Sequence, residues 1–319
     1  MKSITQNLPL LATAAVAVVL YFGAAWRFEN FATLSVFVNL LTDNAFLGVA
    51  AVGMTLVIIS GGIDLSVGAV IGFTSIALTI TLQKVPLPLP VLIFGALGAG
   101  TLFGTLQGSI IHYLRLPAFL VTLAGMFLMR GLAFIISMES VPLENPALVE
   151  FANKSWEITD ETYTGWIPIL FLGTIFAGFI LSNYTPFGRA IYAIGSKEQA
   201  AFLMGVKLGP TRVGVYAISG FCAALAGIVY TLYSQSGTAV AGTTLELDAI
   251  AVAVIGGTLL TGGYGSVIGT FLGVMIFGII QTAITFEGTL NSWWTKIAVA
   301  ALLLLFIGLQ KAITTGLKR

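Results

Sequence analysis

The sequence predicts an all-α protein that crosses a membrane many times, and its composition and its apolar runs lead to this prediction. Of the 319 residues, 57% are hydrophobic and 8% are charged, and the mean hydropathy is +1.01. A soluble domain carries about 25% charged residues, so 14 basic and 13 acidic side chains could not cover a soluble fold of this length. The apolar residues also form long runs close to the ~20 residues that a membrane-spanning helix needs.

The continuity of these runs identifies them as helices. Only helices and closed barrels satisfy the backbone polar groups in lipid, and the strands of a barrel would show alternating hydrophobicity. We expect about ten spans in a single domain over residues 1–319. In chain order the runs are 8–26, 34–59, 64–82, 90–113, 117–137, 167–183, 213–234, 247–260, 266–286 and 294–309.

Three of these runs need separate comment. Run 8–26 has the look of a signal peptide, with Lys2 ahead of it, but the rest of the chain also inserts, so we interpret the run as a retained first span. Run 34–59 is long and carries Asp43, and run 247–260 is short and flanked by glycine. Either of the last two could be broken or partly re-entrant.

The distribution of lysine and arginine predicts which side each loop faces. Cytoplasmic loops carry an excess of these residues, and with ten spans most of the 14 fall on the side that holds both termini. We therefore expect both termini in the cytoplasm. Loop 138–166 then lies on the outer side, and it is acidic, with Lys154 as its one basic residue.

The polar segment 184–212 lies on the cytoplasmic side and predicts a short docking helix. Ser196 can cap the first turn of a helix over 197–204, and Gln199 completes a capping box. Gly205 suits the left-handed residue that closes a helix. A short helix with marked ends and an apolar patch is suited to bind a soluble partner.

Glycine spacing predicts close packing of helices. Small residues four apart let helix backbones approach closely in lipid. Such spacing occurs at Gly68 and Gly72, at Gly100, Gly104 and Gly108, and at Gly265, Gly269 and Gly273.

Charged and amide side chains within the apolar runs are candidates for function, because they are costly in a membrane. Asp43 and Asn44 lie inside the second run, and for Asp43 a polar pathway and a tie between helices are equally consistent. Glu246 and Asp248 begin the eighth run, where capping is the favoured role. Arg130 requires an ion-pair or carbonyl partner, and Asp43 is one candidate.

The sequence Ser60–Gly68 is the sharpest short motif. Its two glycines indicate a tight turn, and Asp64 follows where a carboxylate can meet a helix N-terminus. A turn and cap is favoured over substrate contact. We assign a structural or gating role to Ser60, Gly61, Gly62, Asp64, Ser66, Arg130, Glu246 and Asp248.

Several function classes are excluded. No Gly-x-x-x-x-Gly-Lys-Ser/Thr loop is present, so this chain does not itself hydrolyse ATP. One cysteine and one histidine predict neither a disulfide nor a metal site, and no catalytic triad or carboxylate pair indicates an enzyme. A net charge of +1 does not support nucleic-acid binding.

Taken together, these motifs resemble the permease subunits of bacterial sugar ABC importers of the ribose, arabinose and galactofuranose group. The resemblance covers nearly the whole chain and rests on Ser60–Gly68, Pro117–Met126, Phe187–Arg189, Ala193–Gly195, Glu246–Ala251, Gly256–Gly257 and Gly262–Gly263. Leu41–Gly48 and Gly288–Lys296 are similar more narrowly to the galactofuranose permeases. The family pattern usually follows Gly195 with Gly-Asn, whereas this chain has Ser196-Lys197, which leaves the loop polar.

The resemblance implies a division of labour. It implies a type II importer bundle of about ten spans in the bacterial inner membrane. It also implies that this chain is one of two different permease subunits, which form a heterodimer. An ATPase with two nucleotide-binding domains would bind ATP and Mg on the inside, and a periplasmic sugar-binding protein would deliver substrate to the outside, where the 138–166 loop is the candidate receiving surface. This chain itself would need no cofactor.

The resemblance and the residue chemistry together give site expectations. A sugar needs hydrogen-bond partners more than ion pairs, so we assign the substrate pathway to Asp43, Asn44, Thr122 and Gln281. We assign contact with the ATPase to the cytoplasmic coupling loop 184–212, through Phe187, Gly188, Arg189, Gly195, Ser196, Lys197, Gln199, Phe202, Met204 and Gly205.

Two alternatives stay open on the residues alone. One is a stand-alone secondary transporter driven by protons or sodium, with Asp43, Asp64 and Arg130 as coupling residues. The other is the permease of a related importer, for another sugar or for branched amino acids.

Overall fold

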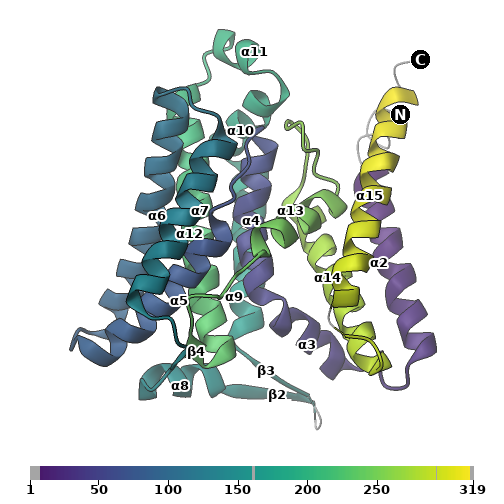
Figure 1. Cartoon of the computed structure of the whole chain (residues 1–319). Helices are drawn as coiled ribbons and strands as arrows, with labels where there is room; N and C mark the ends of the chain where they lie inside the picture. The colour runs from purple at the N-terminus through teal and green to yellow at the C-terminus, as the bar shows by residue number, and fades with distance from the viewer. Residues whose placement is uncertain (1–7, 160–161, 292, 317–319) are drawn as a thin grey trace.

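The computed structural model describes residues 8–159, 162–291 and 293–316 as a helical bundle with two short antiparallel strand pairs, β1–β4 and β2–β3 (Figure 1). The helices are α2 (Leu8–Arg27), α3 (Leu34–Asp43), α4 (Ala45–Ile59), α5 (Val67–Lys84), α6 (Leu89–Tyr113), α7 (Ala118–Ile136), α8 (Pro146–Asn153), α9 (Trp166–Tyr184), α10 (Pro186–Ser196), α11 (Glu198–Leu203), α12 (Leu208–Ser234), α13 (Leu245–Ile255), α14 (Val267–Glu287) and α15 (Trp293–Gly316). The strands are β1 (Val141–Pro142), β2 (Ser155–Thr159), β3 (Thr162–Gly165) and β4 (Ser236–Gly237).

The helix lengths correct the expected count of about ten spans. Within the described residues, 7 helices are long and apolar enough to cross a membrane, and the bent α3–α4 pair would make 8. Two expected spans are not among these 8. Run 294–309 corresponds to the shorter apolar stretch Trp293–Gly308 of α15, and run 247–260 is instead α13, with 11 residues. At 1.5 Å per residue it covers roughly 16 Å, about half of the hydrocarbon core. The prediction was wrong because the helix ends before the apolar run does. The chain turns at Gly256 and Gly257, which lie inside the run.

The run 34–59 is broken, as its length and its acid suggested. Helix α3 ends at Asp43, α4 begins at Ala45, and the two axes differ by 55°. Asn44 occupies the break, and its side-chain Nδ2 donates a hydrogen bond of 3.0 Å to the carbonyl of Leu40. The amide thereby occupies one carbonyl at the end of α3.

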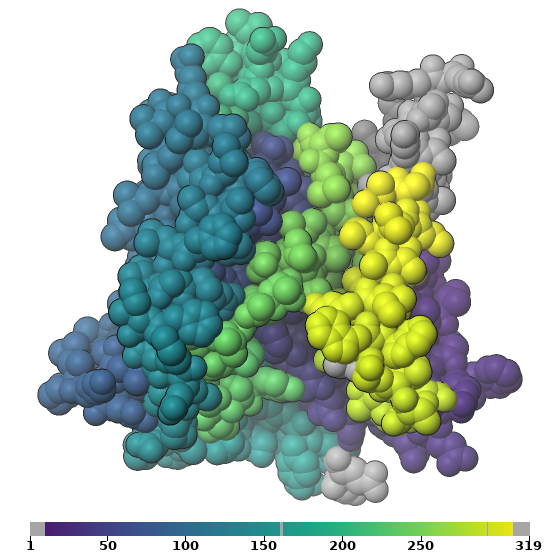
Figure 2. Space-filling view, in the orientation of Figure 1, coloured from purple at the N-terminus to yellow at the C-terminus, as the bar shows by residue number. Residues whose placement is uncertain are grey.

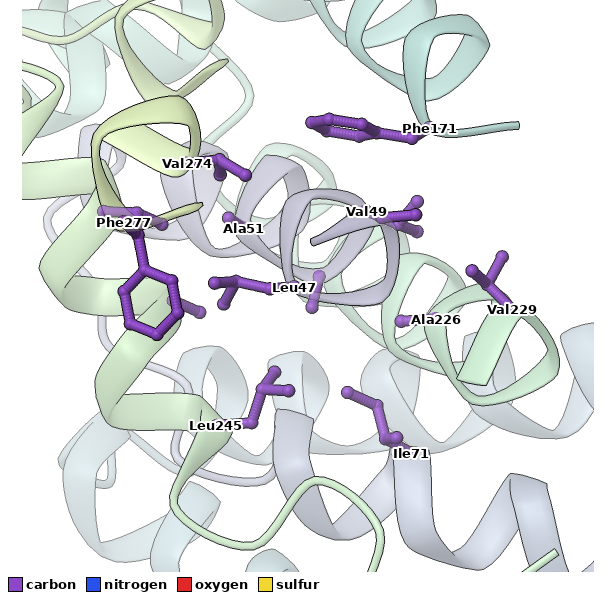
Figure 3. Close-up of a cluster of buried hydrophobic side chains, with 14 of the residues drawn as sticks. Leu47, Val49, Ala51, Ile71, Phe171, Ala226, Val229, Leu245, Val274 and Phe277 are labelled. Atoms are coloured by element: carbon purple, nitrogen blue, oxygen red, sulfur yellow. The ribbon is translucent and has the colours of Figure 1, made fainter. Parts of the chain in front are cut away.

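Helix α4 is the centre of the bundle. All its residues except Phe46 are buried, which fits its uniformly apolar sequence, since a helix that is hydrophobic on every side belongs inside a protein or a membrane. Figure 3 shows side chains of α4 surrounded by others from α5, α9, α12, α13 and α14.

The glycine spacing in α6 brings this helix against α12, as predicted. A Cβ on Gly104 would overlap the carbonyl oxygen of Tyr216, and one on Gly108 would lie 2.9 Å from the Cα of Val213. Gly100 faces Gly220 in the same way. The missing side chains are therefore what allows these two backbones to touch.

The chain between α12 and α14 is mostly not helical, although it passes through the bundle. Near the start of this stretch, Gly237 packs on Ser75 and Thr79 of α5. It finishes beside the end of α4, where the Gly263 N–H donates to the carbonyl of Ile59 at 2.8 Å. Helix α13 is its one helical part. Irregular backbone at this depth is tolerated where protein buries it or where it lines a cavity.

The two ends of the bundle differ. Helices α10 and α11 lie at one end, together with the start of α2 and the end of α15, whereas α8, β2 and β3 lie at the other end (Figure 1). The segments 184–212 and 138–166 are therefore on opposite ends of the molecule.

Candidate functional site

A cavity of about 390 Å³ lies where the two discontinuous segments of the bundle meet. One segment is the α3–α4 break at Asp43 and Asn44. The other is the non-helical stretch 240–243 together with the first turns of α13. The cavity is lined by Asp43, Asn44, Phe46, Leu47, Tyr230, Val240, Ala241, Gly242, Thr243, Leu245, Asp248, Phe277, Gln281, Trp293, Thr295 and Lys296. Figure 2 shows α13, in green, between α7 and the yellow α15 on one face of the molecule.

The polar groups of the cavity are mostly held by neighbours. Asp43 Oδ1 accepts a hydrogen bond of 3.2 Å from the Tyr233 hydroxyl. Asp248 forms an ion pair with Lys296, which ties α13 to the start of α15. Because Lys296 is neutralised by Asp248, the carboxylate of Asp43 is the charge in this lining that forms no salt bridge within the described part of the chain.

Aromatic side chains complete the wall. Phe46 packs edge-on against Tyr230 with ring centroids 5.4 Å apart, and Phe277 and Trp293 also line the space. Amide and carboxylate oxygens beside aromatic faces can bind the hydroxyl groups and the apolar C–H faces of a neutral solute.

The structure brings three of the four expected pathway residues together, and leaves the fourth elsewhere. Asp43, Asn44 and Gln281 line the cavity. Thr122 does not, because it is fully buried and its hydroxyl donates back to the Ala118 carbonyl at 2.8 Å. The sequence reasoning missed the aromatic members and Lys296, since an aromatic residue in an apolar helix gives no signal of which way it faces.

Asp64 forms a buried tie between elements. Its Oδ1 accepts from the Ser66 backbone N–H at 3.0 Å and from the Ser66 hydroxyl at 2.6 Å, and its Oδ2 accepts from Ser219 on α12 at 2.7 Å. The Ser66 hydroxyl also lies 3.1 Å from Gln107 Oε1 on α6. These contacts join the start of α5 to α6 and α12. The bond to the Ser66 N–H belongs to the predicted turn, whereas Ser66, the residue before α5, makes no side-chain capping bond.

Arg130 bonds to backbone and not to Asp43, so the suggested pairing of these two residues is wrong. Its Nη1 donates to the carbonyls of Ala239 at 2.5 Å and Ala241 at 2.8 Å. Glu246 supplies the opposite charge nearby. The other prediction for Arg130, a backbone carbonyl partner, is confirmed. The stretch 239–241 is not helical, so its carbonyls are not occupied by helical hydrogen bonds and can accept from Arg130.

Glu246 and Asp248 both lie in the first turn of α13, where acids were expected. Negative side chains are favourable there because of the helix dipole. Thr244, the residue before the helix, makes no side-chain capping bond.

The coupling segment differs from expectation at its cap. Ser196 is the last residue of α10, and α11 is preceded by Lys197, which makes no side-chain capping bond. The predicted capping box of Ser196 with Gln199 is therefore wrong.

The segment does have a side-chain cap, but at the start of α10. The hydroxyl of Thr185, the residue before α10, accepts a hydrogen bond of 3.0 Å from the Gly188 N–H. The sequence signal for it was a threonine directly before Pro186, since proline favours the first position of a helix. Gly205 has φ of 82° and ends α11, as predicted.

The members of this segment face in two directions. Phe202, Leu203 and Met204 at the tip are 65%, 84% and 71% exposed. Arg189 and the polar run Ser196–Gln199 are exposed as well. On the inner side, a Cβ on Gly214 of α12 would lie 2.9 Å from the Phe187 ring, and Gly188 packs on the end of α9. The salt bridge between Glu198 and Arg212, at 2.9 Å, fixes α11 against α12.

Comparison with known proteins places the chain in a family. Residues 36–307 match the family described as "Branched-chain amino acid transport system / permease component". No solved structure matches the chain significantly.

Curated relatives match over nearly the whole chain. The inner membrane ABC transporter permease protein YjfF of Escherichia coli K12 is 47% identical over 98% of this chain and 94% of its own length. The fructose import permease FruG of Bifidobacterium longum is 35% identical over 97% and 92%. The ribose import permease RbsC of E. coli K12 is 34% identical over 87% and 86%.

These matches select an ABC-importer permease over the stand-alone ion-coupled transporter. YjfF is named as an ABC transporter permease, and FruG and RbsC are named as import permeases for fructose and ribose, which are sugars. A chain of this family is a transport subunit that acts with an ATPase and a binding protein, and it is not a catalytic chain. The chain belongs to the ABC-importer permease family and is a multi-pass inner-membrane permease component of a binding-protein-dependent sugar importer.

Proposed function

We propose that this chain is one of two different membrane subunits of a galactofuranose importer, and that the cavity at the α3–α4 break is its half of the sugar pathway. The observation that carries the proposal is the meeting of two discontinuous segments at a polar cavity. In membrane transporters, broken helices frame substrate sites because their free backbone groups and helix ends can bind the cargo.

The chemistry of the wall favours an uncharged, hydroxylated substrate. Asp43, Asn44 and Gln281 offer hydrogen-bonding oxygens and amides, whereas the Lys296 charge is already matched by Asp248. Galactofuranose is favoured among sugars by the resemblance of Leu41–Gly48 and Gly288–Lys296 to galactofuranose permeases. Both stretches contribute residues to the cavity.

The tip of α11 is the proposed contact with the ATPase. Phe202, Leu203 and Met204 form an exposed apolar surface on a helix of six residues, and α11 lies at the end that also holds the start of α2 and the end of α15 (Figure 1). In this proposal that end is cytoplasmic, with both termini, and ATP and Mg bind to the partner.

The opposite end is proposed to face the periplasm and receive the sugar-binding protein. There, segment 138–166 folds into α8 and the β2–β3 hairpin, with Trp166 stacked on Phe151 at 5.1 Å and edge-on to Trp156 at 4.7 Å. This aromatic cluster gives the acidic loop a defined shape. A second permease would cover the exposed Leu247 and Trp293 beside the cavity, which are 58% and 72% exposed.

The test is reconstitution of the full importer in lipid nanodiscs. The complex would contain this chain, the second permease, the ATPase and the binding protein, and ATP hydrolysis would be measured with a panel of sugars in pyranose and furanose forms. Stimulation by galactofuranose above the other sugars is expected. Equal stimulation by ribose or fructose would overturn the substrate assignment, and a complex that needs only this permease would overturn the heterodimer.

The docking claim has its own test. The double variant Phe202→Ser/Leu203→Ser should lose most of the ATPase during co-purification, because the apolar contact is removed. The matched control is Phe94→Ser, since Phe94 on α6 is 71% exposed and lies outside the α10–α11 segment. Undiminished co-purification of the ATPase with the double variant would sink the docking claim.

A further inference from the structure

The inner side of α10 meets two other chain segments at a contact made largely of glycine. We call this contact the glycine junction and define it by Gly61, Gly195, Ser196, Gly262 and Gly263. Its members come from the turn after α4, the end of α10 and the turn between α13 and α14. Gly195, Gly262 and Gly263 are half-buried, whereas Gly61 and Ser196 are at the surface.

The backbones in the junction touch. A Cβ on Gly195 would overlap the carbonyl oxygen of Ile59 and would lie 2.5 Å from the Gly263 nitrogen. A Cβ on Gly262 would lie 2.8 Å from the Cα of Gly61. Gly262 and Gly263 also have φ of 82° and 75°, a conformation that side chains other than glycine rarely adopt.

Hydrogen bonds lock the same three segments. The Gly263 N–H donates to Ile59 O at 2.8 Å, which joins the α13–α14 turn to α4. The Ser196 hydroxyl donates to Gly263 O at 3.4 Å, and the Tyr192 hydroxyl donates to Gly265 O at 2.9 Å, which join α10 to that turn. Burial, and then the neighbouring Tyr264, raise the pKa of Tyr192, so this hydroxyl stays protonated as a donor.

The junction connects α11 to both discontinuous segments of the cavity. From Gly61, helix α4 runs straight to the break at Asn44. From Gly262, the chain runs back through α13 to the cavity-lining stretch 240–243. A displacement of α10 therefore reaches the two sides of the cavity by two separate routes, each through direct backbone contact.

We infer that the glycine junction transmits the motion of α11 to the cavity, so that Gly195, Ser196 and Tyr192 are positioning residues for transport and do not contact the ATPase. The inference rests on the proposed function, and it separates two roles within one segment. The tip of α11 binds the partner, and the inner side of α10 carries the displacement. Close contact without intervening side chains suits this role, because tightly packed contacts shift between discrete arrangements and do not yield gradually.

The experiment measures sugar uptake per ATP hydrolysed by the full importer in proteoliposomes, for the wild type and for Gly195→Ala. The added methyl group should separate α10 from the end of α4. We expect the ATPase to co-purify normally and to hydrolyse ATP, while uptake per ATP falls by about tenfold, the effect of a ~1.4 kcal/mol change in an equilibrium.

Two controls separate this effect from general damage. Gly131→Ala and Gly173→Ala add the same methyl group to helical glycines that have nothing within 4 Å of the new atom. Both should keep the wild-type ratio of uptake to ATP hydrolysis. The melting temperature of each variant is measured alongside.

A second variant covers the case in which Gly195→Ala does not fold. The double substitution Tyr192→Phe/Ser196→Ala removes two hydrogen bonds and adds no atoms to the contact. It should lower uptake per ATP by about fivefold or more, because two hydrogen bonds are lost together.

The outcomes are distinct. A wild-type ratio in both junction variants, even with a lowered melting temperature, would overturn the inference and leave the junction a purely structural contact. Loss of ATPase co-purification in these variants would also overturn it, because the inner side would then contribute to partner binding. Failure of any sugar to stimulate the wild-type complex would instead refute the proposed function and the inference with it.

Discussion

The contact between α6 and α12 and the region around α13 use glycine for opposite purposes. Between α6 and α12, Gly100, Gly104 and Gly108 lie on continuous helices and bring two backbones together. Around α13, Gly242 and Gly257 have positive φ and lie in the turns before and after the helix. The first region is closed, and the second leaves a cavity of about 390 Å³. The two regions therefore differ in where their glycines lie and not in how many they have. Glycines within a helix form the structural contact, and glycines in turns lie beside the open site.

The largest expected effect is on the closed region. Gly104→Val places a branched side chain where even a Cβ overlaps the Tyr216 carbonyl. Overpacking of this kind costs about 3 kcal/mol or more when backbone must move, so the melting temperature in detergent should fall sharply. Gly98→Val, on the same helix at a glycine with open space, is the control. An equal loss in both variants would remove the distinction between the regions.

The next effect concerns the non-helical chain near the cavity. Arg130→Met removes the donor to the carbonyls of Ala239 and Ala241, and each buried acceptor left unpaired costs ~1–3 kcal/mol. We expect lower thermal stability and lower uptake. Arg130→Lys should recover part of both. Wild-type uptake in Arg130→Met would show that this chain holds its position without the arginine.

A smaller effect is expected within the cavity itself. Asp43→Asn keeps the shape of the side chain and an acceptor for Tyr233 but removes the charge. A hydrogen bond from a sugar hydroxyl to a charged carboxylate is stronger than one to a neutral amide by about 1 kcal/mol. Uptake at low sugar concentration should fall roughly fivefold, with stability nearly unchanged. Tyr233→Phe is the companion variant, because it removes the partner of Asp43 and keeps its charge. If Asp43→Asn changes stability and not uptake, Asp43 is a tie between helices.

The smallest effect is expected at the Asp248–Lys296 ion pair. Lys296→Met should lower stability by only about 1 kcal/mol, since Lys296 is 42% exposed and water screens the pair. The double variant Lys296→Met/Asp248→Asn should regain part of the loss, as measured by thermal unfolding. A drop as large as that of Gly104→Val would show that the open region depends on charge as strongly as the closed region depends on packing.

The two discontinuous segments differ in how far the sequence revealed them. The α3–α4 break could be expected because Asp43 and Asn44 interrupt an apolar run that is too long for one span. The shortness of α13 was only suspected, since the apolar letters continue to Leu260 beyond the last helical residue. The predicted Ser196 cap was wrong because α10 extends to that residue, and there it packs against Ile59 and Gly263, which are far away in the sequence.

The sequence by itself determined the membrane class, the positions of most of the long apolar helices and the family. Length and hydrophobicity of a run decide whether it inserts, and short motifs carry the resemblance. Only the tertiary structure decided that Asp43, Asn44 and Gln281 share a cavity, that Thr122 lies apart and that Arg130 bonds to backbone. The physical reason is the solvent. In lipid the outer faces of helices are as apolar as the inner faces, so hydrophobic periodicity does not tell which face is buried. Helix rotation and crossing, set by glycine contacts far apart in the chain, make that choice.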